Sequence, residues 1–208
     1  MIRTFLFDLG NVLLHFSHDR MCEQIGALCG RTGPDVRKLL IDSGLQWDFE
    51  RGRVSDVEFC RGLGAAAGFG FELEALKHAG SNIFVLNKPM LPILDALKAR
   101  GHRLVLLSNT SVAHFEFIER EYDVLERFDD FVLSFRVGSL KPDAAIYQAA
   151  LATIDCEPAE CFYTDDIAAY VEAGRTYGLQ AEVFTDSAAL LEQLRERNIV
   201  LDFASRKR

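Results

Sequence analysis

Four short segments of the sequence carry polar residues that could act together on a phosphoryl group. They contribute Asp8, Ser108, Lys141 and the pair Asp165-Asp166. Three carboxylates that share a crevice repel one another unless a cation lies among them. A hard cation such as Mg²⁺ prefers such oxygen ligands. With a lysine beside the cation, the charge of a phosphate is neutralised. An aspartate can then attack phosphorus and form an aspartyl-phosphate, which water hydrolyses.

These segments come together only if the chain folds as alternating strands and helices. Short apolar runs predict buried strands at residues 3–8, 103–107, 131–133, 160–164 and 181–184. Apolar residues at helical spacing predict helices at 90–100, 111–121, 143–154, 167–177 and 187–197. Such alternation indicates an α/β fold, a Rossmann-like parallel sheet with helices on both faces. Ligands bind beyond the carboxyl ends of such strands, so the polar residues are expected at one edge of the sheet.

The segment from about residue 19 to residue 86 interrupts this alternation with a purely helical pattern. Helices are predicted at 19–29, 34–44 and 72–80. Another is predicted after Ser55, which resembles an N-cap because Asp56 and Glu58 follow in the first turn. No strand is predicted here. The pattern therefore indicates a small helical insertion after the first strand.

Four motifs in this order resemble those of the haloacid-dehalogenase superfamily. They are Phe7-Asp8-Leu9-Gly10-Asn11-Val12-Leu13, Leu107-Ser108-Asn109-Thr110, Lys141-Pro142 and Tyr163-Thr164-Asp165-Asp166. Their spacing matches over nearly the whole chain, and the first motif is similar to a branch that includes bacterial alpha-glucose-1-phosphate phosphatases. The resemblance implies an α/β core of residues 1–16 and 87–208 and an inserted helical cap of residues 17–86.

The resemblance also implies a role for each matching residue. Asp8 and Lys141 would be catalytic, Asp8 as the nucleophile and Lys141 as the cation that stabilises nucleophile and phosphate. Ser108 and Asn109 would bind the phosphoryl group. The Mg²⁺ ligands would be Asp8, the Gly10 carbonyl oxygen, Asp166 and, directly or through water, Asp165. The function implied is that of a magnesium-dependent phosphatase of a small phosphorylated metabolite.

Gly10 departs from the family pattern, because most phosphatases of this superfamily have a second aspartate at that place. That aspartate protonates the leaving oxygen, which glycine cannot do. A sugar 1-phosphate would need less acid help, because its anomeric hydroxyl is more acidic than an ordinary alcohol. His15 and His18 lie just downstream and could supply a proton, although ordinary loop or cap-entry positions are favoured for both. Phe16, Trp47 and Phe49 could line a substrate pocket.

Two other functions fit parts of the pattern. A 2-haloacid dehalogenase shares the fold and the nucleophile but uses no metal, and the paired acids Asp165-Asp166 argue against it. Such enzymes also usually carry an aromatic residue at the place of Gly10. A non-catalytic phosphate-binding module would explain the missing acid, but Asp8, Lys141 and the acidic pair are intact. Magnesium-dependent turnover distinguishes the three functions.

Composition narrows the class of partner. The 208 residues carry a formal net charge of −8 with interspersed signs, which does not resemble a nucleic-acid footprint. The short basic tail Arg206-Lys207-Arg208 is interpreted as a solvated terminus. No apolar run is long enough to suggest a membrane span. Five cysteines without a C-x-x-C motif favour free thiols and a cytoplasmic location.

Overall fold

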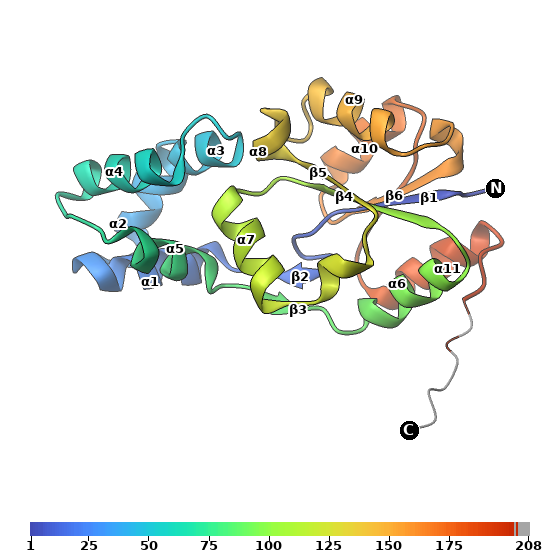
Figure 1. Cartoon of the computed structure of the whole chain (residues 1–208), viewed down its shortest axis with the longest axis horizontal. Coiled ribbons are helices and arrows are strands. Elements are labelled where there is room, and N and C mark those ends of the chain that lie inside the picture. The colour runs from blue at the N-terminus through green and yellow to red at the C-terminus, as the bar shows by residue number, and fades with distance from the viewer. Residues whose placement is uncertain (202, 204–208) are drawn as a thin grey trace.

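The central element is a five-stranded sheet, seen here in a computed structural model that describes residues 1–201 and 203 (Figure 1). The strands lie in the order β5-β4-β1-β6-β7, and every neighbouring pair is parallel. Their bounds are β5 Asp130–Leu133, β4 Arg103–Ser108, β1 Thr4–Phe7, β6 Cys161–Asp165 and β7 Gln180–Val183. All five lie within two residues of the predicted strands. The first strand in the sequence is therefore the middle strand of the sheet.

Helices cover both faces of this sheet, as the continuous apolar runs require. On one face lie α6 (Met90–Ala99), α7 (Val112–Glu121) and α11 (Ser187–Glu196), and on the other lie α9 (Ala144–Thr153) and α10 (Ala168–Thr176). Side chains alternate along each strand. Phe5 and Phe7 therefore pack in the core on the side of α6, α7 and α11, and Leu6 packs in the core on the side of α9 and α10. The predicted α/β fold with a helical insertion is confirmed.

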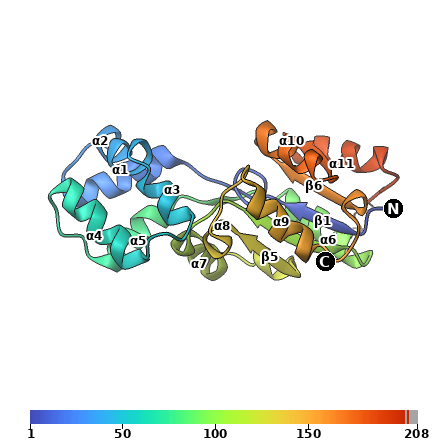
Figure 2. The ribbon, with the colours of Figure 1, turned by 90° about the horizontal axis from the view of Figure 1, so that it is seen from above.

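The helical insertion, which we call the cap segment (residues 17–86), lies at one end of the molecule (Figure 2). Its helices are α1 (His18–Cys29), α2 (Gly33–Arg37), the π-helical turn η1 (Lys38–Asp42), α3 (Leu45–Glu50), α4 (Asp56–Ala67) and α5 (Leu73–Ser81). Their apolar faces share a separate core that includes Met21, Leu40 and Leu63, and Ala113 of α7 also belongs to it. The exact boundaries between core and cap stay a prediction.

Ser55 begins α4 as its sequence context predicted. Its hydroxyl accepts a hydrogen bond from the Glu58 backbone N–H at 3.3 Å, and the Glu58 carboxylate accepts one from the Ser55 backbone N–H at 2.8 Å. This reciprocal pair satisfies two backbone donors at the helix start.

The sequence patterns missed several short elements. The predicted helix 34–44 is instead α2 followed by η1, and α3 and α8 (Ser134–Val137) were not predicted. The prediction of no strand between 19 and 86 is wrong at β3 (Val85–Leu86), which pairs antiparallel with β2 (Leu14–His15) where the chain enters and leaves the cap segment. Two-residue strands and single helical turns are too short to show a period.

Three further features complete the fold. Two 3₁₀ turns, η2 (Val124–Arg127) and η3 (Pro158–Glu160), precede β5 and β6. Among the described residues, no helix combines the length and apolar character that crossing a membrane demands. The basic tail Arg206-Lys207-Arg208 lies outside the described residues.

Candidate active site

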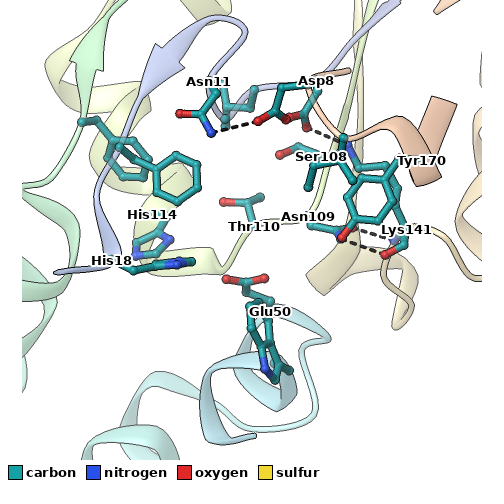
Figure 3. Close-up of a pocket in the computed structure, with 17 residues that line it drawn as sticks. Asp8, Asn11, His18, Glu50, Ser108, Asn109, Thr110, His114, Lys141 and Tyr170 are labelled. Carbon is teal, nitrogen blue, oxygen red and sulfur yellow. Dashed lines mark hydrogen bonds and ion pairs between the residues drawn. The ribbon is translucent and has the colours of Figure 1, made fainter. Parts of the chain in front are cut away.

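The carboxyl ends of three adjacent strands bring the predicted site residues together. Asp8 follows β1, Ser108 ends β4 and Asp165 ends β6, and β1 pairs with both of the other strands. All the predicted residues except the buried Asp165 line one cavity, which opens between the sheet and the cap segment (Figure 3). These are Asp8, Gly10, Ser108, Asn109, Lys141 and Asp166. Residues up to 158 positions apart thus meet at one edge of the sheet, as the parallel-sheet rule predicts.

Lys141 is the electrostatic centre of the site. Its Nζ donates to Asp8 Oδ1 at 2.7 Å, to Asp165 Oδ2 at 2.5 Å and to the Leu107 carbonyl oxygen at 2.9 Å. The residue is only 2% exposed. Burial alone would lower the pKa of the Lys141 ammonium, but the Asp165 and Asp8 carboxylates outweigh burial and hold that pKa above its ordinary value. A fixed positive charge therefore lies directly beside Asp8.

The three aspartates form a cluster that could hold a metal ion. Asp8, Asp165 and Asp166 each offer a carboxylate oxygen within 4.8 Å of the others. Burial, and to a lesser extent the Asp165 charge, raises the pKa of Asp8 to about 7 although Lys141 opposes this. Burial also raises the pKa of Asp166, against the hydrogen bond that Asn11 Nδ2 donates to Asp166 Oδ2 at 2.9 Å. A cation among these oxygens would relieve their repulsion, so the donor set fits a small hard ion.

Asp165 differs from the other two acids because both of its oxygens are already engaged. Oδ2 accepts from Lys141 Nζ and, at 2.6 Å, from the hydroxyl of Tyr163. Oδ1 accepts from the backbone N–H of Ile167 at 2.9 Å. Asp165 is fully buried, whereas Asp166 lines the cavity. The structure therefore leaves Asp8 and Asp166 as the more accessible carboxylates.

Asn109 and Tyr170 hold the lysine loop in place. The Asn109 amide donates from Nδ2 to the Lys141 carbonyl oxygen at 3.1 Å, and its Oδ1 accepts from the Lys141 backbone N–H at 2.7 Å. Nδ2 also lies 3.4 Å from the Tyr170 hydroxyl, which accepts from it. The Lys141 ammonium lies 5.3 Å from the centre of the Tyr170 ring, within cation–π range. These contacts give Tyr170 a place in the site.

The space beside Gly10 is filled by an aromatic ring. A Cβ at position 10 would lie 2.7 Å from Cε1 of Phe16, so any side chain there would displace this ring. The acid missing from position 10 is therefore replaced in space by an apolar group. A proton donor for the site, if one is used, must come from another part of the cavity wall.

The cap segment forms the side of the cavity wall opposite the sheet. Phe16, which precedes it, and Trp47 line the cavity as predicted, but Phe49 does not and packs instead on Phe59 with ring centres 4.4 Å apart. His15 is exposed, lies in β2 where the chain enters the cap segment and does not line the cavity, in agreement with an ordinary cap-entry position. His18 does line the cavity, and burial lowers its pKa.

Glu50 is the functional candidate that the sequence did not indicate. It ends α3, is 6% exposed, and points its carboxyl group into the cavity (Figure 3). Its Oε1 accepts from Gln46 Nε2 at 2.9 Å, one helical turn earlier. Burial raises the pKa of Glu50 to about 7, although the Gln46 hydrogen bond opposes this. A lone glutamate in a short helix matches no motif. Its i, i+4 spacing from Gln46 indicates only that the two side chains lie on the same face of a helix.

The raised pKa of Glu50 predicts a pH-dependent stability. The folded protein binds the Glu50 proton more tightly than the unfolded chain does. The stability that this proton contributes is therefore complete below the ordinary pKa of 4.5 and is lost as pH rises through about 7. Between these two pH values, the unfolding free energy of wild type should fall by about 3 kcal/mol more than that of Glu50→Gln. The figure follows from about 1.36 kcal/mol for each pKa unit. Urea unfolding in chelator between pH 4.5 and about 8 measures the difference. Identical pH profiles would contradict the burial of a titrating Glu50.

Comparison with known proteins decides the family. The family model described as a haloacid dehalogenase-like hydrolase matches residues 2–178. The chain belongs to this family. One relative of this hydrolase is a D-ribitol-5-phosphate phosphatase of Bacteroides thetaiotaomicron, 25% identical over 189 residues that cover 86% of this chain and 90% of the relative.

Solved structures agree with this assignment. A HAD-like family hydrolase from Porphyromonas gingivalis superposes with a TM-score of 0.81 at 26% identity, covering 94% of this hydrolase and 98% of that chain. A HAD family enzyme from Bacteroides thetaiotaomicron, in complex with magnesium and inorganic phosphate, has a TM-score of 0.80 at 21% identity, covering 89% and 96%. At 21% identity, the second likeness shows that the two chains share the haloacid dehalogenase-like fold.

Proposed function

We propose that this hydrolase is a magnesium-dependent phosphomonoesterase that acts through an aspartyl-phosphate on Asp8. The observation that carries the proposal is the bridging position of Lys141 between Asp8 and Asp165, with Asp166 at the same cavity. A nucleophilic carboxylate, a fixed cation and metal-ligating oxygens are what phosphoryl transfer to an aspartate requires. The phosphatase name of the Bacteroides relative and the magnesium–phosphate complex of the similar structure support it.

The contacts in the site support the following roles. Asp8 attacks phosphorus while Lys141, at 2.7 Å from Asp8 Oδ1, holds that carboxylate in place and offsets its charge. Ser108 and Asn109, which line the cavity, bind the phosphoryl oxygens. The bound Mg²⁺ would supply charge neutralisation of the phosphate. Its ligands would be Asp8, the Gly10 carbonyl oxygen and Asp166, with Asp165 reaching it through water because both Asp165 oxygens are engaged.

The alternative functions fit the site less well. A haloacid dehalogenase works without a metal. Among the described residues, the cluster of Asp8, Asp165 and Asp166 would then have Lys141 as its one positive charge within hydrogen-bonding distance. A binding module without turnover has no need for a buried lysine against the nucleophile. The intact ion pair favours catalysis over both.

The substrate class proposed is a small phosphorylated sugar or polyol. The cavity wall combines aromatic rings of Phe16, Trp47 and Phe84 with the polar groups of His18 and Glu50, which suits a carbon chain that carries hydroxyl groups. The sugar 1-phosphate suggested by the acidity of its leaving group and the pentitol 5-phosphate of the Bacteroides relative are both in this class.

The five free thiols support the predicted cytoplasmic location.

Magnesium removal tests the proposal. We expect phosphate release with Mg²⁺ and a loss of at least about 100-fold with chelator, because the bound cation stabilises the transferring phosphoryl group. The panel comprises p-nitrophenyl phosphate, acetyl phosphate, glucose 1-phosphate, glucose 6-phosphate and D-ribitol 5-phosphate. Full activity in chelator, or halide release from 2-chloropropionate in place of phosphate release, would contradict the proposal.

A further inference from the structure

Release of an alcohol from a phosphate monoester requires a proton for the leaving oxygen, and no acid is present at position 10. The Phe16 ring occupies the space that a side chain there would take. Given the phosphatase function proposed above, on which this step rests, another group of the cavity wall must supply the proton.

Apart from the charged cluster around Asp8, four ionisable residues line the cavity: His18, Glu50, His114 and Tyr170. Three of them are unsuited to donate this proton. His114 Nε2 lies 3.1 Å from the Gly80 carbonyl oxygen, so this nitrogen carries a proton that is donated to the backbone. Burial lowers the pKa of His114 to about 4 and also lowers that of His18, which leaves both rings neutral at pH 7. The Tyr170 hydroxyl accepts a hydrogen bond from Asn109, and burial raises its pKa above the ordinary value of 10, which makes it a weaker acid than a free tyrosine.

Glu50 has the position that the other three lack. Its carboxyl group is held from one side by Gln46 and faces the open cavity with the other oxygen (Figure 3). In the part of the chain that the structure describes, this carboxyl group has no ion-pair partner. Because burial raises its pKa to about 7, much of it retains a proton at neutral pH.

The backbone of Glu50 is fixed to the catalytic motif by a buried serine. Ser134 Oγ lies 2.6 Å from the Glu50 carbonyl oxygen and 2.9 Å from the Thr110 carbonyl oxygen, and it accepts from the Thr110 backbone N–H at 2.9 Å. Ser134 is fully buried, and Thr110 is the last residue of the Ser108-Asn109-Thr110 segment. Two residues after Glu50, Gly52 lies so close to the Phe135 carbonyl oxygen that a Cβ would be 2.3 Å from it. The cap segment is therefore anchored to the core at the place where Glu50 enters the cavity.

We propose that Glu50 donates the proton to the leaving-group oxygen, in place of the acid absent from position 10. In the first step, a bond forms between an Asp8 carboxylate oxygen and phosphorus, the bond from phosphorus to the substrate oxygen breaks, and that oxygen takes the Glu50 proton and leaves as an alcohol. In the second step, water attacks phosphorus and the bond to Asp8 breaks. The Glu50 carboxylate takes one proton from this water, so hydrogen phosphate leaves and both carboxyl groups return to their initial states.

Dependence on the leaving group tests this role. Glu50→Gln keeps the size of the side chain and its bond to Gln46 but has no proton to transfer. Single turnovers with enzyme in excess report the first step alone, since leaving-group release then precedes hydrolysis of the aspartyl-phosphate. We expect alcohol release from D-ribitol 5-phosphate to fall by about 100- to 10,000-fold, the usual contribution of general acid catalysis. Release of p-nitrophenolate should change less than about threefold, because this leaving group is stable without a proton.

The matched control is Glu74→Gln, the same change at an exposed position of α5, which should leave both rates unchanged. An equal loss with both substrates would overturn proton donation and assign Glu50 to binding or structure. Unchanged alcohol release would also overturn it while leaving the phosphatase function standing. If wild-type protein released neither leaving group, the proposed function would fail and the role of Glu50 with it.

Discussion

Replacing Asp8 by asparagine is expected to reduce phosphate release by a factor on the order of 10⁴ or more, as loss of a catalytic nucleophile does in other enzymes. The amide is a poor nucleophile, yet its oxygen can still accept the hydrogen bond that Lys141 Nζ donates at 2.7 Å. The fold should stay intact, because the shape of the side chain is kept and Lys141 retains its bonds to Asp165 and Leu107. Steady-state phosphate release and circular dichroism measure the two results.

Asp123→Asn is the matched control for this change. Asp123 is exposed, pairs with Arg127 and lies outside the cavity, so its conversion should leave turnover unchanged. Full activity of Asp8→Asn would refute the nucleophile assignment. Loss of both activity and folded structure would show instead that Asp8 is required for stability.

Replacing Lys141 by methionine is expected to lower both activity and stability. The substitution keeps a long apolar stem but leaves Asp8 and Asp165 as buried carboxylates without their cation. Breaking a buried pair by removing one partner costs about 3–5 kcal/mol of unfolding free energy. Phosphate release should fall by at least about 1,000-fold, because both the nucleophile and the phosphate lose a fixed positive charge. Urea unfolding in chelator and phosphate release with Mg²⁺ measure the two effects.

Lys98→Met provides the comparison at the surface. Lys98 Nζ lies 2.5 Å from Asp129 Oδ1, but both side chains are about one-third exposed, at 36% and 31%. An exposed pair of this kind contributes about 0–1 kcal/mol. Equal destabilisation by the two lysine substitutions would contradict the account of Lys141 as a buried bridge.

The residues at the strand ends could be predicted from the sequence because one physical rule places them. Continuous apolar runs indicate parallel strands, and parallel strands end at one edge of the sheet. The positions of Asp8, Ser108 and Asp165 along the chain therefore implied their meeting in space, and Lys141 reaches Asp8 and Asp165 from the loop that follows β5 and α8. The middle position of β1, with β4 and β6 on either side, was not predicted, because runs that are apolar on both faces do not specify their neighbours.

The cap side of the site could not be predicted in the same way. Glu50, Phe16 and His18 reach the cavity only because the helices of the cap segment pack in one particular arrangement. A helical period shows which face of a helix is apolar but not where its end points. The absence of an acid at Gly10 was visible in the sequence, whereas the Phe16 ring in that space became visible only in three dimensions.

Covalent trapping of the phosphoryl group tests most directly whether Asp8 is the nucleophile. Wild-type protein is mixed with p-nitrophenyl phosphate and Mg²⁺, quenched in acid within the first turnover, digested and mapped by mass spectrometry. An aspartyl-phosphate mechanism predicts one phosphoryl group on the peptide that contains Asp8, removed by hydroxylamine and absent from Asp8→Asn. A phosphoryl group on another residue, or turnover with no phosphorylated peptide under conditions that preserve a control acyl phosphate, would contradict it.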